Sequence, residues 1–123
     1  MAVVVSVINL KGGVGKSTIS MVLAEYMYFR YHKRVLLIDL DSQHNLTQAM
    51  VKPDFVDRLR REGRSVYHLL QPALRNRSVD LEKFIARPPL IVSNISRWGT
   101  KEGLDMIIAL PDLTQIDEEM VTT

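Results

Sequence analysis

The chain contains no cysteine among its 123 residues. This absence excludes disulfides, thiolate metal sites and cysteine-ligated iron–sulfur clusters. An excess of charge of one sign is also missing, because 16 basic residues stand against 14 acidic ones, for a net charge of +2. This nearly even balance of basic and acidic residues does not by itself predict a nucleic-acid partner.

The apolar start of the chain, MAVVVSVINL, lacks the features of a targeting or membrane segment. It has no basic region before it, Ser6 and Asn9 interrupt it, and Lys11 ends it. We therefore expect that the chain has neither a signal peptide nor a membrane span. We also expect a cytoplasmic location. The apolar content of 46% is enough for the core of one domain.

The first 40 residues predict a strand, a helix and a second strand. Ala2–Ile8 is a β-branched apolar run, which is typical of a parallel strand buried on both faces. A glycine loop follows, and then a helix over Lys16–Tyr31 leading to a second apolar strand, Val35–Ile38. One face of that helix is apolar at helical spacing, and its members are Ile19, Val22, Leu23, Tyr26 and Met27. This order predicts a βαβ unit in an α/β fold with a mostly parallel sheet.

The rest of the chain predicts shorter elements. They are a loop entering a short helix over Asp41–Met50, a helix over Val66–Leu70 capped by Ser65 and closely followed by Pro72, a short helix over Asp80–Ala86, strands at Leu90–Val92 and Leu104–Leu110, and a last helix after Asp112. A basic cluster at Arg58, Arg60, Arg61 and Arg64 is interpreted as a solvated helix face, with contact to DNA phosphates as the alternative.

Residues 11–18, KGGVGKST, predict a phosphate-binding loop. Glycines allow the backbone to turn with positive φ and to present its N–H groups to phosphate at a helix N-terminus. Lys16 supplies a positive charge for the β/γ-phosphates. The Ser17 hydroxyl can bind Mg²⁺, and Thr18 can donate to the α-phosphate region. The usual pattern, GxxxxGK[ST], would place a glycine where this chain has Leu10.

With Lys11 at its start, the loop resembles the deviant Walker A motif, xKGGxGK[ST], of the ParA/MinD superfamily of ATPases. The resemblance implies a P-loop NTPase fold of the SIMIBI type. It also implies that Lys11 acts on nucleotide bound by the other subunit of a homodimer. The expected nucleotide contacts, within a Walker A loop at 10–18, are Lys11, Gly12, Gly13, Val14, Gly15, Lys16, Ser17 and Thr18.

The segment Val35–Asn45, VLLIDLDSQHN, resembles the D-x-D-P-Q-x-N pattern of the ParA/Soj partition branch, with Ser42 in place of the proline. The resemblance implies a switch I-like loop at 39–47. In it, Asp39 would lie near Mg²⁺ and Ser17, and Asp41 would orient the attacking water. Alternation would put Asp39 and Asp41 on one side if the strand continued that far. Lys11, Lys16 and Asp41 are the expected catalytic residues, and Ser17 and Asp39 the expected metal contacts.

These motifs indicate a Mg-ATP-dependent dimerisation switch in plasmid or chromosome segregation. The resemblance implies ATP and Mg²⁺ as cofactors, an ATP-dependent homodimer, a ParB-like stimulator and nucleoid association, with nonspecific DNA binding weak or absent here and no membrane. It covers the chain, 1–123, but only the N-terminal half of the family's domain, because no Walker B segment is recognisable. Two alternatives stay open: a non-hydrolysing nucleotide-binding or regulatory fragment, and a cargo-positioning or cellulose-secretion ATPase of the same superfamily.

Overall fold

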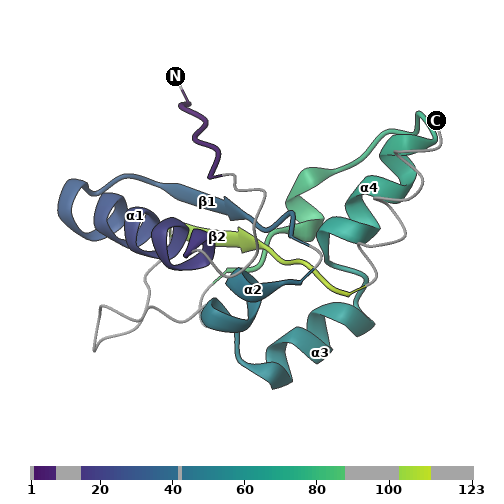
Figure 1. Ribbon diagram of the computed structural model, residues 1–123. Coiled ribbons are helices and arrows are strands. Elements are labelled where there is room, and N and C mark those ends of the chain that lie inside the picture. Colours follow the sequence, from purple (N-terminus) through teal and green to yellow (C-terminus); the bar gives the residue numbers. More distant parts are fainter. Residues whose placement is uncertain (1, 8–14, 42, 88–102, 112–123) are drawn as a thin grey trace.

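Two parallel strands, β1 (Val35–Ile38) and β2 (Leu104–Ile107), lie at the centre of the α/β structure (Figure 1). The structure is a computed structural model that describes residues 2–7, 15–41, 43–87 and 103–111. Val35 is in register with Leu104 and Ile38 with Ile107. The predicted strand at 35–38 is confirmed, and the strand predicted over 104–110 forms in its first four residues.

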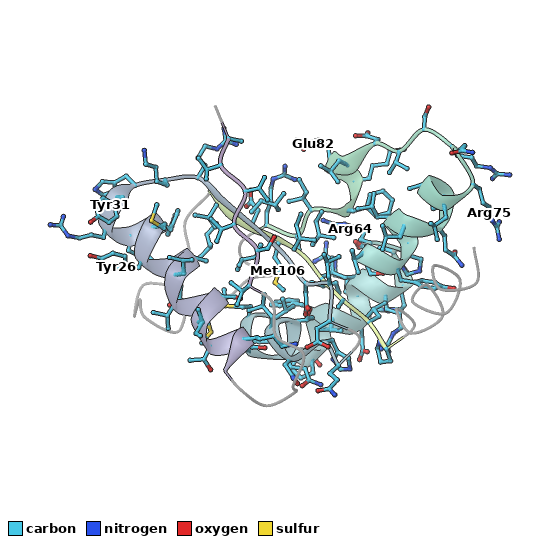
Figure 2. The ribbon with its side chains drawn as sticks, turned by 45° about the horizontal axis from the view of Figure 1, so that its top comes forward. Tyr26, Tyr31, Arg64, Arg75, Glu82 and Met106 are labelled. Atoms are coloured by element: carbon cyan, nitrogen blue, oxygen red, sulfur yellow. The ribbon has the colours of Figure 1, made fainter. Side chains whose placement is uncertain are left out.

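The segment that contains β2 is buried on both faces, as expected for a strand of a parallel sheet. Its side chains alternate between two apolar clusters. One face, with Leu104, Met106, Ile108 and Leu110, packs toward α1, α2 and α3, and the other, with Ile107 and Ala109, packs toward α4. Figure 2 places Met106 in the interior between these layers. This strand therefore holds the helical layers together.

Helix α1 (Lys16–Tyr31) has the bounds that the sequence predicts. It begins after Gly15, whose φ of 89° is left-handed, and ends at His32, which also has a positive φ. The Lys33 N–H then donates to the Met27 carbonyl at 3.2 Å. Met21, Ala24 and Tyr28, spaced by three and four residues, pack on the core cluster. The helix thus covers one side of the β1–β2 pair.

The apolar face predicted for α1 is not the face that is buried. Ile19, Val22, Leu23 and Tyr26 are exposed, with Tyr26 at the outer side of the helix in Figure 2. Tyr26 instead packs edge-on against Tyr31, with ring centroids 5.5 Å apart. Helical spacing correctly groups these side chains on one face, but it does not identify the element that covers them. Among the described residues, none covers this stripe.

The strand predicted over Ala2–Ile8 does not form in the described residues 2–7. Val3, Val4 and Val5 are 85%, 89% and 66% exposed, and the segment extends away from the sheet (Figure 1). A buried parallel strand needs hydrogen-bonded neighbours and cover on both faces. In the described part of the chain only β1 and β2 pair, and residues 2–7 join neither of them.

The described residues between the two strands are mainly helical. They form α2 (Asn45–Met50), α3 (Pro53–Arg61), α4 (Val66–Leu74) and a 3₁₀ turn, η1 (Leu81–Phe84). The predicted Ser65 cap is confirmed, since its side chain accepts from the His68 N–H, but α4 continues through Pro72 to Leu74. Pro72 has no N–H to donate to the His68 carbonyl one turn back, and α4 ends two residues later. The helix predicted over Asp80–Ala86 is only the η1 turn, after which Ala86 bridges to Met106.

Two predicted elements, the strand at Leu90–Val92 and the helix after Asp112, lie outside the described residues. No helix in the described part of the chain is long and apolar enough to cross a membrane.

The basic cluster lies on and after α3 and is interleaved with acids. Arg58 pairs with Glu62 and Arg60 with Asp57, both on exposed helix positions. Hydrogen bonds from Arg64 and Arg58 hold the pKa of the Glu62 carboxyl below its usual range. Arg64, which is central in Figure 2, also donates to the carbonyls of Lys83 at 3.1 Å and Ile85 at 2.6 Å. It thereby ties the α3–α4 turn to the segment that bridges β2.

We expect Arg64→Lys to lower the free energy of unfolding by about 1–2 kcal/mol, because a single ammonium cannot reproduce the two carbonyl contacts of the guanidinium fork. Urea denaturation measures this change. Arg61→Lys, an exposed position on α3, is the matched control and should leave the midpoint unchanged. Equal midpoints for the two variants would contradict a structural role for Arg64.

Candidate functional site

The start of α1 carries the described part of the predicted phosphate loop. Gly15 adopts a φ of 89°, a conformation that residues with a Cβ rarely adopt, and Lys16 begins the helix. Ser17 is half-buried and Thr18 exposed. The other predicted contacts, Lys11, Gly12, Gly13 and Val14, lie outside the described residues.

The structure brings Lys16 next to Asp41. The Lys16 ammonium lies 3.8 Å from Asp41 Oδ2, and both side chains are about 30% exposed. Asp41 Oδ1 accepts the Gln43 N–H at 2.9 Å, and the Asp41 carbonyl accepts the His44 N–H at 2.8 Å. Asp41 therefore forms a turn at the start of the predicted switch I-like loop, with its second carboxylate oxygen directed to the loop lysine.

Asp39, in contrast, is buried, with 3% of its surface exposed. Oδ1 accepts the Asp41 N–H at 3.1 Å. Oδ2 accepts both the backbone N–H of Thr47 at 3.0 Å and the Thr47 hydroxyl at 2.6 Å. A buried carboxylate is costly unless donors satisfy it, and these three bonds do so.

Thr47 connects this carboxylate to the segment after β2. Its hydroxyl oxygen accepts the Ala109 N–H at 2.9 Å while donating to Asp39, and the residue is fully buried. Residues 62 positions apart in the chain thus share one hydrogen-bonded hydroxyl. Thr47 was not predicted to belong to the site, because the sequence shows only a polar residue near the start of a predicted short helix.

The geometry that joins Asp39 to Asp41 differs from the one expected. β1 ends at Ile38, so strand alternation does not extend to these two acids. One is buried and the other half-exposed, and they are linked by the Asp41 N–H rather than by a shared strand face. The structure nevertheless places Lys16, Asp41 and Asp39 in one continuous set of contacts.

The donor set can be tested against Mg²⁺. No group of three or more acidic, histidine or cysteine side chains in the described ranges forms a ready metal cage. Mg²⁺ prefers oxygen ligands and is usually held by one or two carboxylates together with waters and substrate phosphates. Asp39 and Ser17 provide a carboxylate and a hydroxyl of this kind. The chemistry of these two groups suits a cation that is also held by a phosphate, and Asp39 is buried on three hydrogen bonds from the protein.

The parallel α/β layers, the glycine-to-lysine start of α1 and the acidic segment after β1 define the class of protein. Together they describe an α/β fold of the P-loop type. A family model described as an AAA domain matches residues 2–123, nearly the whole chain. The chain belongs to that family, which is ParA/MinD-like, and its relatives place it in the partition branch.

Individual relatives agree with this assignment. The chromosome-partitioning ATPase Soj of Thermus thermophilus is 48% identical over 67 residues, which cover 54% of this chain and 23% of the relative. A putative replication protein A of Sinorhizobium fredii is 32% identical over 108 residues, 76% of this chain and 26% of that protein. A crystal structure of a Corynebacterium diphtheriae protein superposes with a TM-score of 0.66 at 29% identity, over 89% of this chain and 36% of that one. The chain thus spans about a quarter of the length of these curated relatives.

We expect Asp39→Asn to lower the free energy of unfolding by roughly 2 kcal/mol, because the amide cannot accept from all three donors that face the buried carboxylate. Asp41→Asn, at a half-exposed position, should cost less than about 1 kcal/mol, as is usual for an exposed ion pair. Chemical denaturation of the two variants measures the difference. Equal losses would show that burial of Asp39 does not organise this end of the sheet.

Proposed function

We propose that this chain is the Mg-ATP-binding part of a partition-type ATPase, a nucleotide-dependent dimerisation switch for plasmid or chromosome segregation. The observation that supports it is the pairing of Lys16, at a helix start preceded by a left-handed glycine, with Asp41, in the segment that follows strand β1. The names of the relatives, a chromosome-partitioning ATPase and a putative replication protein, support the partition assignment.

In this proposal, each described residue has a role at the phosphates. Lys16 exchanges its contact with Asp41 for the β/γ-phosphates and offsets the charge that develops there. Asp41, once released, accepts a proton from the attacking water and orients it. Ser17 and Asp39 hold the magnesium ion, which supplies further neutralisation of phosphate charge when bound.

The remaining roles are proposed from the sequence motif. Backbone N–H groups of Gly12, Gly13, Val14 and Gly15 surround the phosphates, and Thr18 contacts the α-phosphate region. Lys11 reaches nucleotide held by the second subunit. A ParB-like protein stimulates hydrolysis, and nonspecific DNA binding, weak or absent in this stretch, would place the protein at the nucleoid within the cytoplasm.

A non-hydrolysing nucleotide-binding or regulatory fragment remains the second candidate. The exposure of Val3, Val4 and Val5 favours it, because an apolar run this exposed indicates that the described residues do not complete the core. The two candidates differ in turnover. Steady ATP hydrolysis by the purified chain that is lost in Lys16→Ala would eliminate the second candidate.

We expect calorimetric titration with Mg-ATP to show saturable binding. Lys16→Ala should lower the ATP affinity by at least about tenfold, because the positive charge of Lys16 at the phosphates is expected to contribute several kcal/mol. Lys33→Ala, an exposed lysine between α1 and β1, is the matched control and should bind as the parent chain does. No binding by a folded parent chain, or equal binding by all three proteins, would reject the proposal.

We expect Lys11→Ala to bind Mg-ATP but to remain monomeric when a slowly hydrolysed ATP analogue is added. The parent chain should double its mass under the same conditions, because Lys11 is proposed to act across the dimer. Light scattering after gel filtration measures both masses. A dimer of unchanged stability in Lys11→Ala would assign this lysine to its own subunit's loop instead.

A further inference from the structure

The hydroxyl of Thr47 occupies a position that a purely apolar core would not require. It is fully buried, donates to Asp39 Oδ2 at 2.6 Å and accepts the Ala109 N–H at 2.9 Å. The Ala109 N–H can only donate, so the Thr47 oxygen accepts from it and the hydroxyl proton is directed at Asp39 Oδ2. The Ala109 N–H dipole therefore polarises the Thr47 hydroxyl, whose single proton forms the hydrogen bond to Asp39.

These contacts determine which part of Asp39 can meet a ligand. A carboxylate offers about four acceptor sites, two on each oxygen. Thr47 uses both sites of Oδ2 through its backbone N–H and its hydroxyl, and the Asp41 N–H uses one site of Oδ1. Among the donors in the described residues, none uses the second site of Oδ1, the oxygen that accepts from Asp41, the residue that pairs with Lys16.

We propose that Thr47 is a positioning residue: its hydroxyl holds Asp39 so that Oδ1 alone faces the magnesium ion that accompanies ATP. The same bond couples metal binding to the segment 108–110 after β2. This inference rests on the proposed function and extends it to a residue that contacts neither phosphate nor metal. Outer partners of this kind orient a metal ligand and change metal affinity when they are removed.

The test compares ATP affinity with Mg²⁺ and with EDTA in the parent chain, Thr47→Val and Thr47→Ser. The valine has the shape of threonine without its hydroxyl, whereas the serine keeps the hydroxyl. We expect Thr47→Val to reduce the factor by which Mg²⁺ strengthens ATP binding by about tenfold, in the range typical of outer-shell substitutions. The affinity in EDTA should be unchanged, and Thr47→Ser should behave as the parent chain does. A merely structural role would weaken binding equally under both conditions, and that result would overturn the inference.

A second measurement requires no variant, so it decides the question even where Thr47→Val does not fold. Amide resonances of the parent chain are recorded with ATP in EDTA and again after Mg²⁺ is added. We expect the Thr47 and Ala109 amides to shift together with those of Gly15 and Lys16. Shifts confined to the start of α1 would overturn the coupling while leaving the proposed function intact. Absence of ATP binding in the parent chain would instead reject the proposed function, and this inference with it.

Discussion

A single buried carboxylate organises the end of the sheet at which the candidate site lies. Removing Asp39 from water is unfavourable unless hydrogen-bond donors replace its hydration, so the positions of those donors are strongly constrained. They come from Asp41 in the loop and from Thr47 in α2, and Thr47 in turn is bound to Ala109 after β2. One charge thereby fixes the relative positions of a strand end, a loop, a helix and the neighbouring strand.

The two acids after β1 consequently have different freedom. Asp39 cannot change partners without leaving its donors unsatisfied in the interior, which is among the costlier events in a folded protein. Asp41 is half-exposed, and its contact with Lys16 at 3.8 Å belongs to a class of ion pairs worth at most about 1 kcal/mol. A phosphate group competing for Lys16 meets little resistance. The proposed switch would therefore combine a fixed acid, Asp39, with an exchangeable one, Asp41.

Local signals in the sequence predicted local structure well. The bounds of α1, the strand Val35–Ile38 and the Ser65 cap follow from helical spacing, β-branched residues and a side chain that can accept at a helix start. Predictions that needed a distant partner were less successful. The exposed face of α1 and the unpaired run at residues 2–7 both depend on which elements cover them. Thr47 was missed for the same reason, since its importance comes from Ala109, 62 residues further along the chain.

The exposed apolar surfaces begin directly beside the candidate site. Thr18, which is only two residues after Lys16, and Ile19 line a groove. The groove continues along α1 to Tyr26. The groove is apolar, and the curated relatives are about four times as long as the stretch that this chain matches. Any element that covered this face would also restrain the first turn of α1, where the proposed phosphate contacts lie. Completion of the core and binding of nucleotide should therefore favour each other, because each reduces the conformational freedom that the other must remove.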